Sequence, residues 1–314
     1  MTIVVEEVKQ SEEKSSERAF IHLWPLAAAM FTIALIWRLV DVFVLGLGDT
    51  WLNIFPSKLG PLLVMIFVLW KVYDRGSMQK LLGLVNSHFR AQLIIGLVLG
   101  VSFYLCIDII GSVVYTFLFN PSYDLTLTIV TPNILWYAFI FFFVNAVFEE
   151  SLFRGLLQNT FKTKVTVGKA ILLSAAIFGV WHAVWPVING APFTEFASMV
   201  LLSGILGAFL GVFYEKFSGG KTLIGTITCH TLINFLNEHF KIGPDASTQG
   251  PDFVFNDPIF LLISMLIFFG MMSFYFAFSS KYRVEQAETL GTRVKGYLSA
   301  TMGNKENNQT KGEN

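Results

Sequence analysis

The stretch from 144 to 158, VNAVFEESLFRGLLQ, places three ionisable residues at the end of a strongly apolar run. They are Glu149, Glu150 and Arg154, and the residues just before them read ILWYAFIFFFVNAVF. Such a run is typical of a membrane-spanning helix, which needs about 20 predominantly apolar residues. A charged side chain at the bilayer centre costs roughly 2.5–3.5 kcal/mol, so these three residues should face a protein interior or a wet cavity. They are therefore predicted to mark a functional site.

The composition of the whole chain is typical of a membrane protein. Of its 314 residues, 54% are hydrophobic and 14% are charged, whereas soluble domains carry about 25% charged residues. The formal net charge is zero, which argues against nucleic acid as a partner. Cys106 and Cys229 both lie in apolar stretches, so no disulfide framework is predicted. We expect an all-α, multi-pass integral membrane protein, located in the cell membrane if the source is prokaryotic.

Eight apolar stretches of about the length that a bilayer requires can be traced along the chain. They lie near residues 20–48, 59–73, 92–119, 133–161, 168–187, 196–217, 222–240 and 258–280. We expect them to form a single transmembrane helical domain over residues 20–280. A disordered cytosolic tail is predicted at 1–19 and a second cytosolic tail at 281–314.

The placement of Lys and Arg predicts the orientation of these helices. About 18 of these residues fall in the two tails and in the loops on one side, against 2, Lys58 and Lys241, in the loops on the other side. Loops rich in Lys and Arg stay in the cytosol. Both termini are therefore predicted to be cytosolic.

Polar residues recur at helical spacing in three of the predicted helices. Glu150 and Arg154 are four residues apart and can pair on one helix face. Glu149 points about 100° away from Glu150, so one carboxylate is left without the arginine. Phe178–His182 spells F-x-x-x-H, and His230–Asn234 spells H-x-x-x-N. One intramembrane histidine is usually a helix–helix hydrogen-bonding group, but two histidines with a surplus glutamate favour a catalytic site.

These motifs together resemble those of the CAAX protease and bacteriocin-processing (CPBP) family. E-E-x-x-x-R, F-x-x-x-H and H-x-x-x-N stand in this order on three separate predicted helices. The family consists of intramembrane endopeptidases and includes the type II CAAX prenyl endopeptidases. The resemblance extends from about the third predicted helix to the seventh and implies hydrolysis of peptide bonds within the membrane.

The resemblance also implies roles for individual residues. Glu149 matches the glutamate that activates water, and His182 would help to hold that water. His230 and Asn234 match the groups that stabilise the oxyanion. Donors of this kind gain strength where water is scarce.

A zinc site is the alternative reading of the same residues. Glu149, His182 and His230 form a two-histidine, one-carboxylate set that would leave an open water position on zinc. No H-E-x-x-H motif is present, and we therefore prefer a mechanism without metal or other cofactor. The family resemblance implies that Glu150 and Arg154 are supporting residues.

A membrane-anchored or prenylated peptide or protein would suit such a site, because a prenyl chain delivers the scissile bond to the lipid bilayer. In the prenyl-protease branch, the reaction would remove the last three residues of a CAAX tail. The rival interpretation is a non-catalytic membrane scaffold or a transporter that keeps the polar cluster for structure or ion binding. Transporters often carry broken helices in matched halves, and no such symmetry is visible in this sequence.

Several other polar or aromatic residues are interpreted as structural. Arg38, Asp41 and Asp108 are expected to tie helices together, although Asp108 could line the cavity. Trp181 and Trp185 are interpreted as packing residues or as anchors at the membrane interface.

Two local matches to the motifs of intramembrane aspartyl proteases are set aside. Asp49 ends a G-x-G-D sequence and Asp74 follows Tyr73. The predicted orientation places the two carboxylates at opposite faces of the membrane, too far apart to share a proton.

Overall fold

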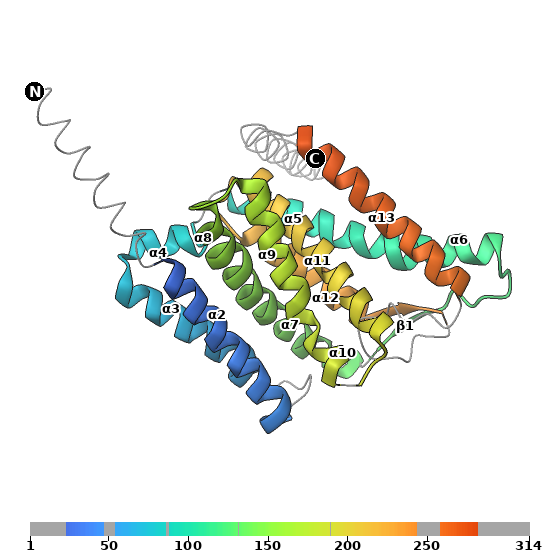
Figure 1. Cartoon of the computed structure of the whole chain (residues 1–314). Coiled ribbons are helices and arrows are strands. Elements are labelled where there is room, and N and C mark those ends of the chain that lie inside the picture. The colour runs from blue at the N-terminus through green and yellow to red at the C-terminus, as the bar shows by residue number, and fades with distance from the viewer. Residues whose placement is uncertain are drawn as a thin grey trace, which may run out of the picture.

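The computed structural model describes residues 23–46, 54–85, 88–130, 132–188, 190–243 and 258–281. Within these ranges the chain is almost entirely helical, and Figure 1 shows the helices packed in one bundle. The expected all-α class is confirmed. The predicted tails, 1–19 and the residues after Lys281, lie outside the described part of the chain, as does Asp49.

Each of the eight predicted spans contains helix, and several helical segments are joined end to end. The first part of the chain holds α2 (Leu23–Val40) with the π-helical η1 (Asp41–Leu45), η3 (Ile54–Leu59) with α3 (Gly60–Val72), α4 (Arg75–Leu81), and the run of α5 (Phe89–Tyr104), η4 (Leu105–Ile110) and α6 (Gly111–Leu118). The second part holds η5 (Pro132–Ile134), α7 (Leu135–Glu150), η6 (Ser151–Gln158), α8 (Asn159–Lys162), α9 (Val167–His182), α10 (Val184–Ile188), α11 (Phe193–Lys216), α12 (Ile224–His239) and α13 (Pro258–Lys281).

Five helices of the described part are long and apolar enough to cross a membrane. They are Leu23–Leu45, Phe89–Leu118, Leu135–Lys162, Phe193–Lys216 and Pro258–Lys281. Large apolar side chains remain on their surface, with Phe117 and Phe193 each 78% exposed. Exposed apolar surface of this extent is expected where a protein faces lipid. The chain is an integral, multi-pass membrane protein, and the number of eight spans remains a prediction.

A small sheet connects the loop before α7 to the end of α12. The strands β1 (Leu127–Ile129) and β2 (Phe240–Ile242) pair antiparallel, with Leu127 opposite Ile242 and Ile129 opposite Phe240. Strands of three residues leave no alternating pattern in a sequence, so they were not predicted. Because β2 follows α12 directly, the sheet ties this helix to the start of α7.

The structure differs from the sequence prediction at two helix boundaries. The predicted fifth span, 168–187, divides after His182, because Pro186 has no N–H to donate to the carbonyl of that residue. The predicted second span begins earlier than expected, at Ile54 rather than Leu59. Lys58 was therefore wrongly assigned to a loop, since it lies within a helical segment and its side chain is only 7% exposed.

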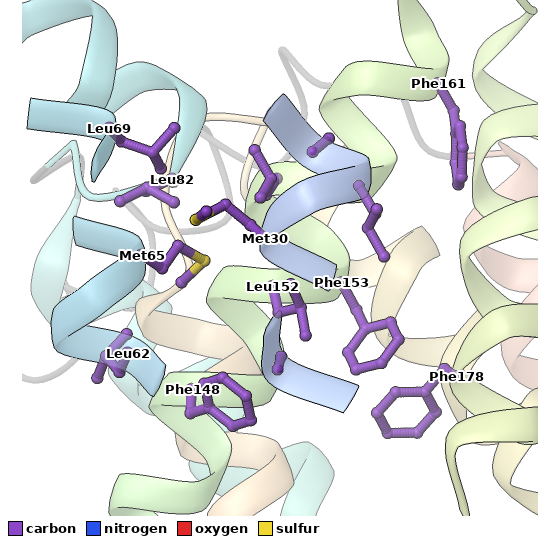
Figure 2. Close-up of a cluster of buried hydrophobic side chains, with 14 of the residues drawn as sticks. Met30, Leu62, Met65, Leu69, Leu82, Phe148, Leu152, Phe153, Phe161 and Phe178 are labelled. Carbon is purple, nitrogen blue, oxygen red and sulfur yellow. The ribbon is translucent and has the colours of Figure 1, made fainter. Parts of the chain in front are cut away.

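The largest apolar cluster fixes α2 and α3 against the helix that carries the glutamates. Met30 of α2, Met65 of α3 and Leu152 and Phe153 of η6 belong to this cluster, and Figure 2 shows Met30 and Met65 directed toward each other and the ring of Phe153 toward Phe178. Phe153 also packs edge-on against Phe178 of α9, with 4.9 Å between the ring centroids. The same apolar surface that holds the bundle together thus sets the position of α7 and η6 between their neighbours.

Glycines allow two pairs of helices to approach closely. A Cβ atom on Gly96 of α5 would lie 2.5 Å from the carbonyl oxygen of Gly225 on α12. A Cβ atom on Gly179 of α9 would lie 2.4 Å from the carbonyl oxygen of Val200 on α11. Small residues at such contacts are the usual means by which membrane helices pack. They bring α9 and α12 into the positions from which their histidines reach α7.

Candidate active site

Three buried ionisable residues lie where α7 passes into η6. Glu149, Glu150 and Arg154 are 2%, 0% and 1% exposed. The helix changes from α to π geometry directly after Glu150, and short π segments inside helices occur frequently at functional sites. The expectation that these charges face the protein interior and not lipid agrees with their burial.

Glu150 is held by two partners on its Oε1 atom. Arg154 Nη1 donates to it at 2.9 Å, which confirms the predicted pair. The Nδ1–H of His230 donates to the same oxygen at 2.8 Å. Arg154 also donates from Nη2 to the carbonyl of Gly207 and stacks on the ring of Phe178 at 4.3 Å. The arginine is therefore fixed by three helices and holds Glu150 in turn.

The Oε2 atom of Glu149 faces both His182 and His230. The distance from its Oε2 atom is 3.7 Å to His230 Nε2 and 4.0 Å to His182 Nε2. This Oε2 atom is buried and has no hydrogen-bond partner among the described residues. The structure thus brings together, from three separate helices, the three residues that the sequence motifs singled out. Among them only His182 is notably exposed, at 22% of its side chain.

The hydrogen bonds assign the tautomer of both histidines. His182 Nδ1 lies 2.8 Å from the carbonyl oxygen of Phe178, and His230 Nδ1 lies 2.8 Å from Glu150. A carbonyl and a carboxylate only accept hydrogen bonds, so each Nδ1 carries a proton. In the neutral rings the two Nε2 atoms are then acceptors that face the acceptor Oε2 of Glu149. Three acceptors around one point require a donor between them, namely a water, an added proton or a cation.

Trp181 is a site residue that the sequence analysis missed. Its Nε1–H donates to Glu149 Oε1 at 3.2 Å, and the residue is 2% exposed. The ring packs against Phe31, Phe148 and Phe153, which fixes the direction of its N–H group. Trp181 is therefore a packing residue, as predicted, and in addition a hydrogen-bond donor to Glu149.

Two buried cations approach Glu149 from the N-terminal part of the chain. The Arg38 guanidinium lies 4.9 Å from the centroid of the Trp181 ring, and its side chain is 5% exposed. Arg38 and Lys58 both interact electrostatically with Glu149. Arg38 thus contacts another helix, as expected. It contacts Trp181, the residue that donates a hydrogen bond to Glu149.

Two asparagines lie one helical turn from the central residues. Asn234 follows His230 by four residues on α12, is half-buried and forms no hydrogen bond to another described residue. Asn145 precedes Glu149 by four residues on α7 and is 7% exposed. Its Oδ1 atom has no partner among the described residues. Buried polar groups are normally hydrogen-bonded, so both carboxamides are available to a bound molecule.

Other residues considered at the sequence level do not join this group. Cys229 is a free, fully buried cysteine next to His230 in α12, and adjacent helical residues point about 100° apart. Asp74 begins α4, where it accepts hydrogen bonds from the backbone N–H groups of Gly76 and Ser77. Hydrogen bonds from the Ser77 side chain and backbone hold the pKa of Asp74 below its ordinary value. This aspartate has the role of a helix cap and not of a protease residue.

The zinc alternative can be compared with these distances. Ligand atoms bound to one tetrahedral zinc at 2.0–2.1 Å lie about 3.3 Å apart. The separations from Glu149 to the two imidazoles, 3.7 and 4.0 Å, are wider. They leave room for a water hydrogen-bonded to these groups, and a metal would require them to draw together. The described residues contain no group of three His, Cys, Asp or Glu side chains placed closely enough to hold a metal ion.

Comparison with known proteins agrees with the site. Residues 131–236 match the sequence model of a family described as Type II CAAX prenyl endopeptidase Rce1-like. The matched segment contains α7, α9 and α12 as far as Leu236, so it includes Asn234, and it begins at the fourth predicted span instead of the third. No curated protein and no solved structure matches the chain. The resemblance to the CPBP family is confirmed over this segment, and the family indicates a peptidase of the intramembrane CAAX type.

Proposed function

Taking the match to the type II CAAX prenyl endopeptidase family as the premise, we propose that this chain cleaves membrane-anchored, prenylated peptides near their C-terminus. The observation that carries the proposal is the convergence of Glu149, His182 and His230 on one point inside the bundle. Carboxylate and imidazole groups are the usual general acids and bases of hydrolysis. Their buried position suits a substrate that a lipid chain delivers to the membrane.

We assign the general base to Glu149. A water between Glu149 Oε2 and His182 Nε2 donates a proton to the glutamate while its oxygen attacks the scissile carbonyl carbon. Glu149 later passes this proton to the leaving amine nitrogen, so that the step produces a carboxylic acid and an amine. The hydrogen bond from the Trp181 N–H group holds Oε1 of Glu149 and so keeps Oε2 directed toward the water.

The oxyanion of the tetrahedral intermediate is assigned to His230 and Asn234. The Nδ1–H of His230 is engaged by Glu150, so Nε2 donates only when the ring is protonated. The Asn234 carboxamide, one turn further along α12, supplies the second donor. Arg154 keeps Glu150 in place.

Replacement of the proposed base tests the assignment. Glu149→Gln retains the shape of the side chain and removes its ability to take a proton. We expect cleavage of a prenylated CAAX peptide by the purified variant to fall at least 100-fold. The matched control is Glu195→Gln in the first turn of α11, an exposed residue, which should cleave at the wild-type rate. A Glu149→Gln variant as active as the wild type would remove this glutamate from the mechanism.

The same assay tests the zinc alternative and the need for a prenyl group. Incubation with a strong chelator should leave the rate unchanged if Glu149 acts on water directly. Loss of activity that added zinc restores would assign Glu149, His182 and His230 as metal ligands instead. In a panel of matched peptides, the prenylated peptides should be cleaved faster than the unprenylated ones. Equal cleavage of both would show that the prenyl group takes no part in substrate recognition.

A further inference from the structure

Lys58 lies beside α7, outside the segment that the family match covers. The segment η3, which contains Lys58, packs against α7. The ammonium Nζ atom lies 6.0 Å from the centroid of the Phe141 ring, and the side chain is 7% exposed. Burial of an ammonium group is costly unless its charge is balanced. Lys58 interacts electrostatically with Glu149, so its charge acts within the site.

One side of α7 runs from Phe141, which Lys58 contacts, to the proposed base Glu149, and it carries a polar residue, Asn145, between them. Phe141, Asn145 and Glu149 are spaced four residues apart, so they lie along one side of the helix. Asn145, between the other two, is buried and its Oδ1 atom has no partner among the described residues. An acceptor in this position can receive a hydrogen bond from a main-chain N–H of a bound peptide.

From these positions we propose that Lys58 binds the C-terminal carboxylate of the substrate and that Asn145 binds the main chain of the leaving peptide. The inference rests on the proposed peptidase function. Phe141 and Glu149 are eight residues apart, which is about 12 Å along a helix. Three residues in extended conformation span about 10–11 Å. A carboxylate at Lys58 therefore places the bond before the last three residues next to Glu149.

Lys58 would also offset the negative charge of the acidic residues in the site. Glu149 and Glu150 are 2% and 0% exposed and carry carboxylates. Arg154 pairs with Glu150. A substrate carboxylate that entered without Lys58 would be repelled by these groups. Lys58 thus determines whether a free C-terminus is attracted or rejected.

The test compares two forms of one prenylated peptide, with a free C-terminal carboxylate or a C-terminal amide. Wild-type protein should cleave the carboxylate form with a kcat/KM about 10- to 100-fold higher. Lys58→Met should lose this preference or reverse it, as measured by the ratio of its kcat/KM values for the two forms and not by its absolute rate. Lys58→Arg should retain the preference. Asn145→Ala should lower kcat/KM for both forms equally, because both present the same main chain.

Lys71→Met is the matched control, since Lys71 lies on α3 and is exposed, and it should keep the preference. Thermal unfolding in detergent shows whether each variant is folded, and the comparison of the two peptides by wild-type protein needs no variant at all. Equal cleavage of both peptides by the wild type, or an unchanged preference in folded Lys58→Met, would overturn the carboxylate subsite and leave the peptidase proposal intact. Absence of cleavage of every peptide by the wild type would overturn both.

Discussion

Glu149 has a different neighbour on each of its oxygens, and this asymmetry decides what it can do. Oε1 accepts a hydrogen bond from the Trp181 N–H group, while Oε2 faces the two imidazoles. A carboxylate held by one oxygen presents the other in a fixed direction, which is what a general base requires. Glu150, which lies next to it in the chain, is occupied by Arg154 and His230. Two adjacent glutamates thus have separate roles.

Removal of the Trp181 hydrogen bond should impair catalysis without unfolding the protein. Trp181→Phe keeps an aromatic ring in the cluster of Phe31, Phe148 and Phe153 and deletes the N–H group. Hydrogen bonds to charged groups contribute about 1.5–3 kcal/mol, so we expect kcat to fall about 10- to 100-fold with little change in KM.

A tryptophan elsewhere provides the control for this variant. Trp70 of α3 is 54% exposed, and Trp70→Phe should change neither kcat nor KM. If Trp181→Phe lowered activity only in proportion to a loss of folded protein, the tryptophan would be a packing residue alone.

At the scale of elements, close helix contacts set the distance between the residues that we propose to be catalytic. Gly179 lies in α9 between Phe178 and the histidine-bearing last turn, directly against α11. Gly179→Ala would force the added methyl group against the carbonyl of Val200, and overpacking of this kind costs about 1–3 kcal/mol. We expect a lower midpoint of thermal unfolding in detergent and reduced cleavage, because α9 must move away from α11.

Gly168 at the start of the same helix offers a direct comparison. A Cβ atom there would meet nothing within 4 Å, and alanine stabilises a helix relative to glycine by about 0.8–1 kcal/mol. Gly168→Ala should therefore leave the unfolding midpoint unchanged or raise it. Equal effects of the two substitutions would show that the contact at Gly179 does not limit packing.

The helices were predictable from the sequence because apolar length is a local property. The pair of Glu150 and Arg154 was also predictable, since both residues lie on one helix. The sequence did not reveal the contact of Trp181 with Glu149, which joins residues 32 positions apart. It also did not reveal the burial of Lys58, because a lysine at the edge of an apolar run is usually a loop residue. The convergence of three motifs could be expected only through the family resemblance.

At the scale of the whole molecule, the orientation in the membrane remains a prediction from the positions of Lys and Arg. Single cysteines can test it in a background without Cys106 and Cys229. Ser122 and Lys164 are both exposed, the first in a loop predicted outside and the second in a loop predicted in the cytosol. A membrane-impermeant maleimide should label Ser122→Cys in intact cells and Lys164→Cys only after permeabilisation. The opposite pattern would invert the orientation and place both termini outside.

The first helices contribute to the site although the family match begins only at residue 131. Arg38 stacks on Trp181, and Lys58 lies beside α7. A chimaera that joined the matched segment to foreign N-terminal helices would preserve every motif residue and still lack both cations. Proteins that share the three motifs can therefore diverge in what they cleave through changes in helices that no motif describes.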